Sequence, residues 1–441
     1  MIGTGTGARN RGRGLGYTRA PPPYPTRMLS LHSARTRTGH AGDARIGLAV
    51  AGGGPIGAMY ELGALRALDE ACDGLDLTRL DCYVAVSSGA FLAAGLVNGM
   101  GTAQLCRIFI TDDSLDVHFR PETFLRPALM EYLHRLGAAP RLLTALARDL
   151  VLGRGDSRWS DLLTRLGGLV PTGMFDNAGI ERFLREVFTR GGRSNDFRTL
   201  AHPLYVIAVD LDSGEAVRFG GAGWDDVPIS RAVQASAALP GLYSPVELRG
   251  RHFVDGALRR TMHASVVLDR GVDLMLGINP LVPFNPGRRG DPQLDRRIAS
   301  GGLPVVLSQT FRTLLQSRMQ VGLARYAQQY PDIDQMVFEP NAADGDLFFT
   351  NVFSFAARRR IGDLAYRNTL ADLRERADVV GPILAAHGIH LRPEILADRE
   401  RSILDGLGPA PRHSDTTVRL QRALDDVEHR IAGRRHRTRH A

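Results

Sequence analysis

Residues 50–65 have the sequence VAGGGPIGAMYELGAL, in which an apolar run meets three consecutive glycines and then a helical pattern. The run at 46–51 is short, continuous and apolar, which is typical of a buried strand in a parallel sheet. From Met59 to about Cys72 the apolar side chains recur at helical spacing. The order of strand, glycine loop and helix predicts an α/β fold with helices on both faces of a sheet.

The glycines of this stretch allow two interpretations. Gly52, Gly54 and Gly57 fit G-x-G-x-x-G, the pattern of a dinucleotide-binding loop. That loop requires an acidic residue about 20 positions further on, at the end of the second strand. The second predicted strand spans 82–86 and ends at Ser87, and the acidic residues of this region all precede it. A P-loop is also excluded, because no G-K-[ST] follows the glycines. Dinucleotide binding therefore ranks behind a catalytic role.

The sequence AVSSG at 85–89 resembles the pattern G-x-S-x-G with alanine in its first position. In that pattern a sharp strand-to-helix turn exposes a serine hydroxyl, and small residues on either side let the turn pack closely. Ser87 occupies the central position between Ala85 and Gly89, whereas a pattern centred on Ser88 would begin at Val86. Ser87 also opens a predicted helix, whose N-terminal dipole favours developing negative charge. Ser87 is the predicted nucleophile.

A nucleophilic serine gives the glycine loop a second possible purpose. A tetrahedral intermediate needs preorganised N–H donors, each worth about 10²–10³ in rate. Gly52, Gly53 and Gly54 can direct successive amides to one point, because no Cβ stands in the way. Close packing of a helix on a strand explains Gly57 but explains three glycines in a row poorly. The loop is therefore predicted to form an oxyanion hole.

A general base is the remaining requirement. In FVDGA at 253–257, Asp255 ends a predicted strand and Gly256 lets the chain turn. A free aspartate titrates near 3.9, but burial away from cations would raise its pKa towards neutrality. Asp255 could then accept the Ser87 proton, although Asp-Gly is also an ordinary turn dipeptide. The late histidines His387 and His390 lie in a polar segment without an obvious partner.

Together these segments resemble the patatin-like phospholipases, also called patatin-like lipid acyl hydrolases. GGGPIG (52–57) is similar to the glycine-rich oxyanion motif of that family, AVSSG (85–89) to its nucleophile elbow, and DGA (255–257) to its Asp-Gly-Gly/Ala motif. The resemblance covers about residues 46–280. It implies a three-layer α/β/α sandwich with a mostly parallel central sheet, and a Ser-Asp dyad without cofactor, metal or catalytic histidine.

By position, the resemblance makes Ser87 the nucleophile and Asp255 the general base. The amides of Gly52, Gly53 and Gly54, joined by Ser88 N–H, would form the oxyanion hole. Two positions depart from the family pattern. Ile56 stands where the family often has arginine or lysine, which puts a phospholipid head group in more doubt than ester hydrolysis. Ala85 adds a methyl group to the elbow.

The rest of the chain is predicted to divide as follows. Residues 1–43 are a disordered Gly/Arg/Pro-rich extension, and 44–290 are the catalytic domain, with a helical insertion at 107–176 that forms either a packed helix pair or a lid. Residues 291–408 are a mainly helical continuation of the same unit, and 409–441 are a basic tail with a short amphipathic helix. Further elements are expected as hairpins at 203–220 and 246–258, strands at 273–278 and 335–338, and helices from 228, at 304–330 and at 356–386.

Composition narrows the class of protein. The 441 residues are 44% hydrophobic and 23% charged, as in ordinary globular proteins, and no run of about 20 apolar residues predicts a membrane span. The net charge of +8 is concentrated in the two ends: residues 1–45 carry eight arginines and one acid, and residues 409–441 carry eight arginines and four acids. Three cysteines, without a C-x-x-C pair, suggest buried thiols in a reducing compartment.

We therefore expect a cytoplasmic serine hydrolase of lipid or other acyl esters that can also contact a membrane peripherally, with no nucleic acid as partner. The alternative is a patatin-fold adaptor that has lost catalysis and binds membranes or nucleic acid through its basic tails. The motivation for that alternative is the pair of departures at Ile56 and Ala85 together with the charge of the tails.

Overall fold

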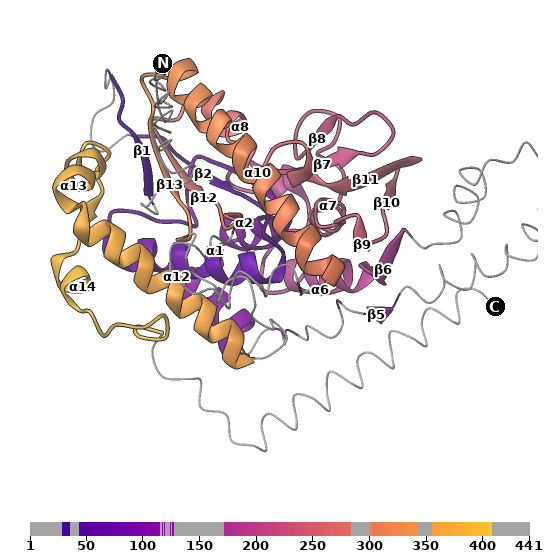
Figure 1. Cartoon of the computed structure of the whole chain (residues 1–441), viewed down its shortest axis with the longest axis horizontal. Coiled ribbons are helices and arrows are strands. Elements are labelled where there is room, and N and C mark those ends of the chain that lie inside the picture. The colour runs from indigo at the N-terminus through magenta and orange to yellow at the C-terminus, as the bar shows by residue number, and fades with distance from the viewer. Residues whose placement is uncertain are drawn as a thin grey trace, which may run out of the picture.

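The computed structural model describes residues 29–35, 44–114, 172–283, 302–341 and 355–407, together with positions 117, 119, 124, 126, 127 and 300. Within these residues a nine-stranded sheet forms the centre of the fold (Figure 1). Its strands are β1 (Leu29–His32), β2 (Ile46–Val50), β4 (Cys82–Val86), β7 (Leu204–Asp210), β8 (Ala216–Phe219), β10 (Val246–Leu248), β11 (Arg251–Asp255), β12 (Leu274–Ile278) and β13 (Asp334–Phe338).

The strand order is β1-β13-β12-β2-β4-β7-β11-β10, with β8 paired to β7. The five neighbouring strands from β13 to β7 run parallel, whereas β1, β8, β10 and β11 are antiparallel to their neighbours. The carboxyl ends of the parallel strands therefore share one edge of the sheet, the edge at which α/β proteins place their sites. The predicted mostly parallel α/β sheet is confirmed.

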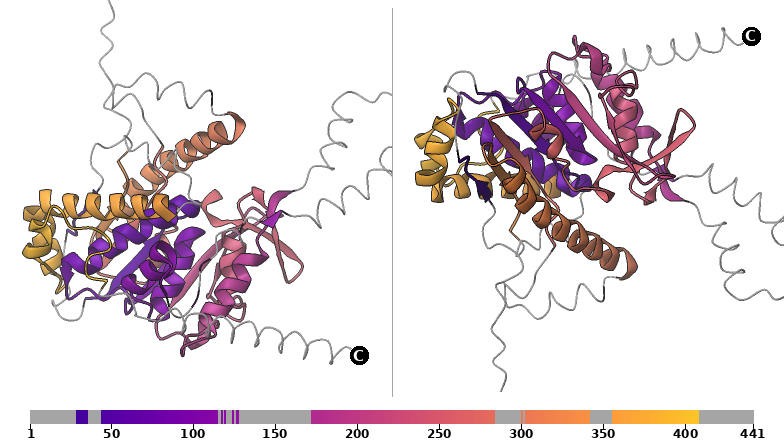
Figure 2. Two further views of the ribbon diagram at one scale, coloured as in Figure 1. Left: turned by 90° about the horizontal axis from the view of Figure 1, so that it is seen from below. Right: turned by 90° about the horizontal axis from the view of Figure 1, so that it is seen from above.

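Helices cover both faces of the sheet (Figure 2). Along β4 the side chains alternate, so that Tyr83 and Ala85 enter one buried cluster while Val84 and Val86 enter the other. The first cluster lies beneath α1, α2, α7 and α12, and the second beneath α8 and α10. The helices are α1 (Gly54–Ala71), α2 (Ser88–Val97), α3 (Thr102–Cys106), α6 (Ala178–Phe188), α7 (Ile229–Ser236), α8 (Ser265–Leu268), α10 (Gly302–Gln329), α12 (Phe355–Glu375), α13 (Ala377–Ala385) and α14 (Pro393–Ala397).

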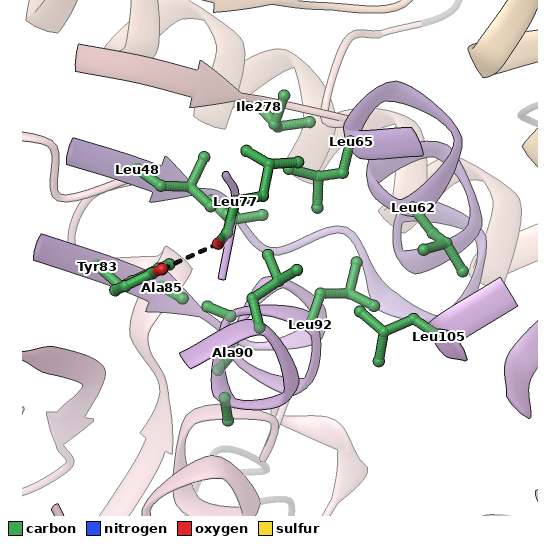
Figure 3. Close-up of a cluster of buried hydrophobic side chains, with 14 of the residues drawn as sticks. Leu48, Leu62, Leu65, Leu77, Tyr83, Ala85, Ala90, Leu92, Leu105 and Ile278 are labelled. Atoms are coloured by element: carbon green, nitrogen blue, oxygen red, sulfur yellow. Dashed lines mark hydrogen bonds between the residues drawn. The ribbon is translucent and has the colours of Figure 1, made fainter. Parts of the chain in front are cut away.

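The first cluster fixes the strand and helix that flank the glycine loop. Leu48 on β2 and Tyr83 on β4 face Leu62 and Leu65 from α1 (Figure 3). The Tyr83 hydroxyl, which is fully buried, donates a hydrogen bond to the Leu77 carbonyl at 2.9 Å. These side chains have almost no exposed surface, so close packing holds both the strand and the helix that flank the glycine loop.

Most predicted elements appear within a few residues of their expected limits. The strand at 82–86 is confirmed to the residue, and both hairpins form, as β7–β8 and β10–β11. The helix after the glycine loop begins at Gly54 and not at Met59, with Pro55 in its first turn. The helix expected over 356–386 is divided at Arg376 into α12 and α13.

The expectation that residues 1–43 lack structure is wrong for Leu29–His32, which form the edge strand β1 against β13. The Ala34 amide extends this contact by donating to Asp334 Oδ1 at 2.7 Å. A four-residue edge strand needs only a backbone partner, so an Arg- and Gly-rich surrounding sequence does not prevent it. Residues 1–28 and 36–43 lie outside the described residues.

The two ends of the predicted insertion at 107–176 are described. A π-helical turn spans Arg107–Thr111, and β5 (Arg126–Pro127) and β6 (Gly173–Asp176) join β9 (Gly241–Tyr243) in a three-stranded sheet. The helices expected within the insertion, and the tail at 409–441, lie outside the described residues. Helices of the described part are all too short or too polar to cross a bilayer.

Candidate active site

Ser87 stands at a strained turn between β4 and α2. Its backbone adopts φ 50° and ψ −121°, although a positive φ is uncommon for a residue with a side chain. Such strain costs on the order of 1–3 kcal/mol and persists only where neighbours hold it. Here the Ser87 amide donates to Ser236 Oγ at 2.8 Å, and Ser236 Oγ donates to the Ile207 carbonyl at 2.5 Å. Two secondary-structure elements therefore hold the turn in place.

The residues two positions away from Ser87 explain how this turn packs. A Cβ on Gly89 would lie 2.5 Å from the Ala51 carbonyl oxygen, so this position has no room for a side chain. Ala85, in contrast, has no exposed surface and extends its methyl group into the first buried cluster (Figure 3). The departure at Ala85 is thus accommodated by the core.

Asp255 meets Ser87 across β7. Val86 pairs with Ile207 on one side of β7, and Asp255 pairs with Ala208 on the other. Ser87 follows Val86 directly, so this pairing places it beside Asp255, whose Oδ1 accepts the Ala257 amide at 2.9 Å. The predicted nucleophile and the predicted base are therefore neighbours in space, although 168 positions separate them in the sequence.

Asp255 is buried, and in the part of the chain that the structure describes no cation is paired with it. The residue is 3% exposed, and burial raises the pKa of its carboxyl group to about 6, while the hydrogen bonds from Ser87 and Ala257 lower it. Gly256 is needed beside it, because a Cβ there would lie 2.3 Å from the Ile207 carbonyl oxygen. A carboxylate of this kind is a far better proton acceptor near neutral pH than a free aspartate.

The glycine loop approaches the same hydroxyl. A Cβ on Gly52 would lie 2.7 Å from Ser87 Cβ and 3.5 Å from Ser87 Oγ, so the bare backbone is what allows the approach. Gly54 has φ 63°, a conformation that glycine adopts without strain. The loop of the sequence prediction and the predicted nucleophile are thus neighbours in space.

The three glycine amides do not have equal freedom. The Gly53 amide donates to Ser88 Oγ at 2.8 Å and is therefore already engaged. Among the described residues, the amides of Gly52, Gly54 and Ser88 have no hydrogen-bond acceptor. These three amides remain able to donate a hydrogen bond, whereas the Gly53 amide is engaged within the site.

Three contributors to this site were missed by the sequence analysis. Ser236 holds the Ser87 turn, and the hydroxyl of Ser88 connects Gly53 to the buried carboxyl of Glu61, which it contacts at 2.9 Å. His263 Nε2 lies 3.2 Å from the Gly256 carbonyl oxygen, and burial lowers the pKa of this histidine to about 4. No sequence pattern predicts these residues, because each one contacts the site through a hydrogen bond that forms only in the folded chain.

The late histidines lie elsewhere. His387 Nε2 contacts Asp334 Oδ2 at 2.7 Å, at the amino-terminal end of β13. Ser87 follows the carboxyl-terminal end of the parallel strand β4, so the two residues lie at opposite edges of the sheet. No group of three potential metal ligands occurs within the part of the chain that is described.

The chain is similar to one protein family and to several solved structures. The family model described as patatin-like phospholipase matches residues 48–268, half of the chain. Among solved structures, the chain is similar to VipD from Legionella pneumophila (18% identity, 64% of this chain and 59% of VipD, TM-score 0.30). It is also similar to ExoU in its complex with SpcU from Pseudomonas aeruginosa (16% identity, 87% of this chain and 85% of that chain, TM-score 0.23). A third similar structure is human GIVD cytosolic phospholipase A2 in complex with methyl gamma-linolenyl fluorophosphonate and terbium chloride (14% identity, 80% of this chain and 60% of that chain, TM-score 0.30).

Proposed function

Since the chain belongs to the patatin-like phospholipase family, we propose that it is a serine hydrolase that cleaves fatty-acyl esters of lipids. The observation that carries the proposal is the pairing of β4 and β11 with β7, which brings Ser87 beside the buried carboxyl group of Asp255. The amides of Gly52, Gly54 and Ser88, which have no acceptor among the described residues, support it, because acyl transfer needs donors for the oxyanion. The chain spans 59% of the length of VipD, so the activity of a longer relative is not simply transferred to it.

The proposed reaction proceeds in two steps. Ser87 Oγ attacks the ester carbonyl carbon as its proton passes to Asp255, and the Gly52, Gly54 and Ser88 amides stabilise the oxyanion. Collapse breaks the bond to the alcohol, which leaves with the proton from Asp255. Water, activated in turn by Asp255, then hydrolyses the acyl group from Ser87. The raised pKa of Asp255, about 6, suits a base that must accept and return a proton near neutral pH.

The substrate class is proposed to be broader than phospholipids. Ile56, half-buried against the first cluster, supplies no cation for a phosphate on the glycine loop. A cytoplasmic location is part of the proposal, because Cys72, Cys82 and Cys106 are all buried free thiols. The adaptor alternative depends on tails at 1–28 and 409–441 that lie outside the described residues, and nothing in the described site favours it.

A substrate panel tests this function directly. Purified protein should release fatty acid from p-nitrophenyl acyl esters and from at least one of phosphatidylcholine, phosphatidylglycerol and diacylglycerol vesicles. It should also be labelled by a fluorophosphonate probe, with the modified peptide containing Ser87. Absence of both turnover and labelling would contradict the hydrolase and favour the adaptor, which should retain binding that is lost on deletion of residues 1–28 and 409–441.

A further inference from the structure

Helix α10 (Gly302–Gln329) has apolar side chains on the face that points away from the core. Leu307, Phe311, Leu314 and Val321, here called the outer stripe, are 44%, 40%, 56% and 69% exposed. Their spacing of four, three and seven residues places them along one side of the helix. The neighbouring side of the helix, about a quarter turn away, packs on the sheet through Leu315, Met319 and Tyr326, all buried. An apolar row on an outward face marks an interaction surface.

This helix is attached to the candidate active site. Arg318 Nη1 donates to the Leu258 carbonyl at 3.0 Å, and Leu258 is three residues beyond Asp255. Thr261 Oγ1 donates to the Leu315 carbonyl at 3.2 Å, so a second bond joins the same segment to α10. Figure 2 shows α10, drawn in orange-brown, projecting from the body of the fold. The outer stripe therefore lies on an element that is fixed to the turn after Asp255.

The charge of α10 indicates what covers the stripe. The helix contains Arg312, Arg318 and Arg325 and has no acidic residue along its 28 positions. Arg318 donates to the Leu258 carbonyl, whereas Arg325 is exposed and follows Val321 by four residues, which places it on the same side as the stripe. Apolar side chains flanked by arginines are typical of helices that lie in the plane of an anionic bilayer surface.

We propose that the outer stripe of α10 docks on the surface of an anionic lipid bilayer, with Arg325 contacting lipid phosphates. Docking of this helix would hold the turn after Asp255 close to the bilayer surface. The binding itself does not require the Ser87 chemistry, so it goes beyond the proposed function and can fail or succeed independently of it.

Sedimentation with vesicles tests the docking surface. The full chain should bind phosphatidylglycerol-containing vesicles more tightly than pure phosphatidylcholine vesicles, and added salt should weaken the binding. The double variant Leu307→Glu/Leu314→Glu should bind at least about tenfold more weakly, because two apolar anchors are lost and two repelling charges are gained. Val379→Glu is the matched control, since Val379 is 48% exposed on α13, away from the stripe.

Hydrolysis of a soluble p-nitrophenyl ester and the melting temperature of each variant report on folding. Both should be close to those of the unsubstituted protein. If the double variant fails to fold, Val321→Glu alone gives the same comparison at the most exposed position. Equal vesicle binding by the double variant and the control would overturn the proposal. So would a stripe-dependent dimer in light scattering, which would make a second copy of the chain the occupant.

Glu61 supports a second inference from a separate observation. This residue of α1 has no exposed surface, and its Oε1 accepts the Ser88 hydroxyl, which itself accepts the Gly53 amide. Glu61 Oε2 has no hydrogen-bond partner among the described residues, an expensive arrangement unless the carboxyl is neutral. Burial raises the pKa of Glu61 well above its ordinary value, in agreement with a neutral carboxyl group.

We infer that Glu61 is a positioning residue, which acts through Ser88 to hold Gly53 and so directs the Gly52 and Gly54 amides towards the oxyanion. The inference rests on the proposed function. Without the Glu61 acceptor, the Ser88 hydroxyl would be free to rotate and the loop would lose its tether to α1. Catalysis would then fall while substrate binding changed little, because a transition-state interaction is what weakens.

Two substitutions separate positioning from packing. Glu61→Leu should lower kcat for a soluble ester about tenfold or more with KM nearly unchanged, and should slow fluorophosphonate labelling of Ser87 in parallel. Glu61→Gln keeps an oxygen acceptor and should restore most of the activity. If Glu61→Leu does not fold, Ser88→Ala interrupts the same chain of bonds.

An unchanged kcat in Glu61→Leu, or a Glu61→Gln variant as slow as Glu61→Leu, would contradict this role. A loss of melting temperature without a loss of kcat would make Glu61 purely structural. Failure of the proposed function looks different, because activity would then survive replacement of Ser87.

Discussion

Replacing Ser87 by alanine should lower kcat/KM for a p-nitrophenyl acyl ester by about 10⁴-fold or more, as expected when a nucleophile is lost from a site that works as a unit. Fluorophosphonate labelling should disappear at the same time. The fold should be retained, because alanine preserves the Cβ and the amide that donates to Ser236 Oγ at 2.8 Å. Initial rates at saturating and limiting substrate, together with a melting curve, measure these effects.

Ser317→Ala is a matched control for this experiment. Ser317 is exposed on α10 and takes no part in the hydrogen bonds given for Ser87 and Asp255, so its loss removes a hydroxyl group of the same size from outside the site. The control should retain full activity and labelling. Turnover by Ser87→Ala at more than about one hundredth of the normal rate would exclude Ser87 as nucleophile, since loss of the nucleophile from such a site costs far more than about 10²-fold.

The sequence predicted the structure best where the pattern within one short segment is enough to determine a strand or a turn. Strand β4 could be predicted because five consecutive apolar residues end at a small-residue turn, and the hairpin β10–β11 because Gly250 separates two short apolar segments. Gly89 and Gly256 occupy positions where a Cβ would strike a carbonyl oxygen at 2.5 Å or less, so the predicted motifs correspond to real steric demands.

Contacts between distant segments were beyond the same reasoning. β1 was missed because the alternation in LSLH is only four residues long and stands in an Arg- and Gly-rich stretch, so the strand depends on its partner β13. Ser236 contacts Ser87 across 149 positions, and Glu61 contacts Ser88 across 27. The sequence also could not show which glycine amide is already hydrogen-bonded. The bond from the Gly53 amide to Ser88 Oγ, which separates Gly53 from Gly52 and Gly54, is visible only in the structure. The catalytic roles of these residues stay predictions.

Asp255→Asn should make the protein inactive and more stable at once. Loss of a general base lowers kcat by about 10²–10⁴-fold. The effect on stability follows from the pKa, which is about 6 in the fold against 3.8 as the ordinary value. The folded state therefore holds the proton more tightly than the unfolded state, and ionisation of Asp255 opposes folding as pH rises from about 4 to about 6. Above that window the penalty is complete, on the order of 2–3 kcal/mol.

Asparagine removes this penalty because it is neutral at every pH, and it can still accept the Ala257 amide with its oxygen and donate to Ser87 with its nitrogen. The melting temperature of Asp255→Asn at pH 8 should therefore exceed that of the unsubstituted protein by a few degrees, and the difference should vanish near pH 4.

Activity, in contrast, requires the ionised carboxylate of Asp255. In the unsubstituted protein kcat/KM should fall about tenfold per pH unit below about 6, where Asp255 becomes protonated. A variant that is both inactive and less stable at pH 8 would indicate that Asp255 supports the fold through its charge, whereas a pH profile that is flat from 5 to 8 would exclude Asp255 as the base. The buried carboxylate thus lowers stability at the pH where it works, and that opposition distinguishes a catalytic aspartate from a structural Asp-Gly turn.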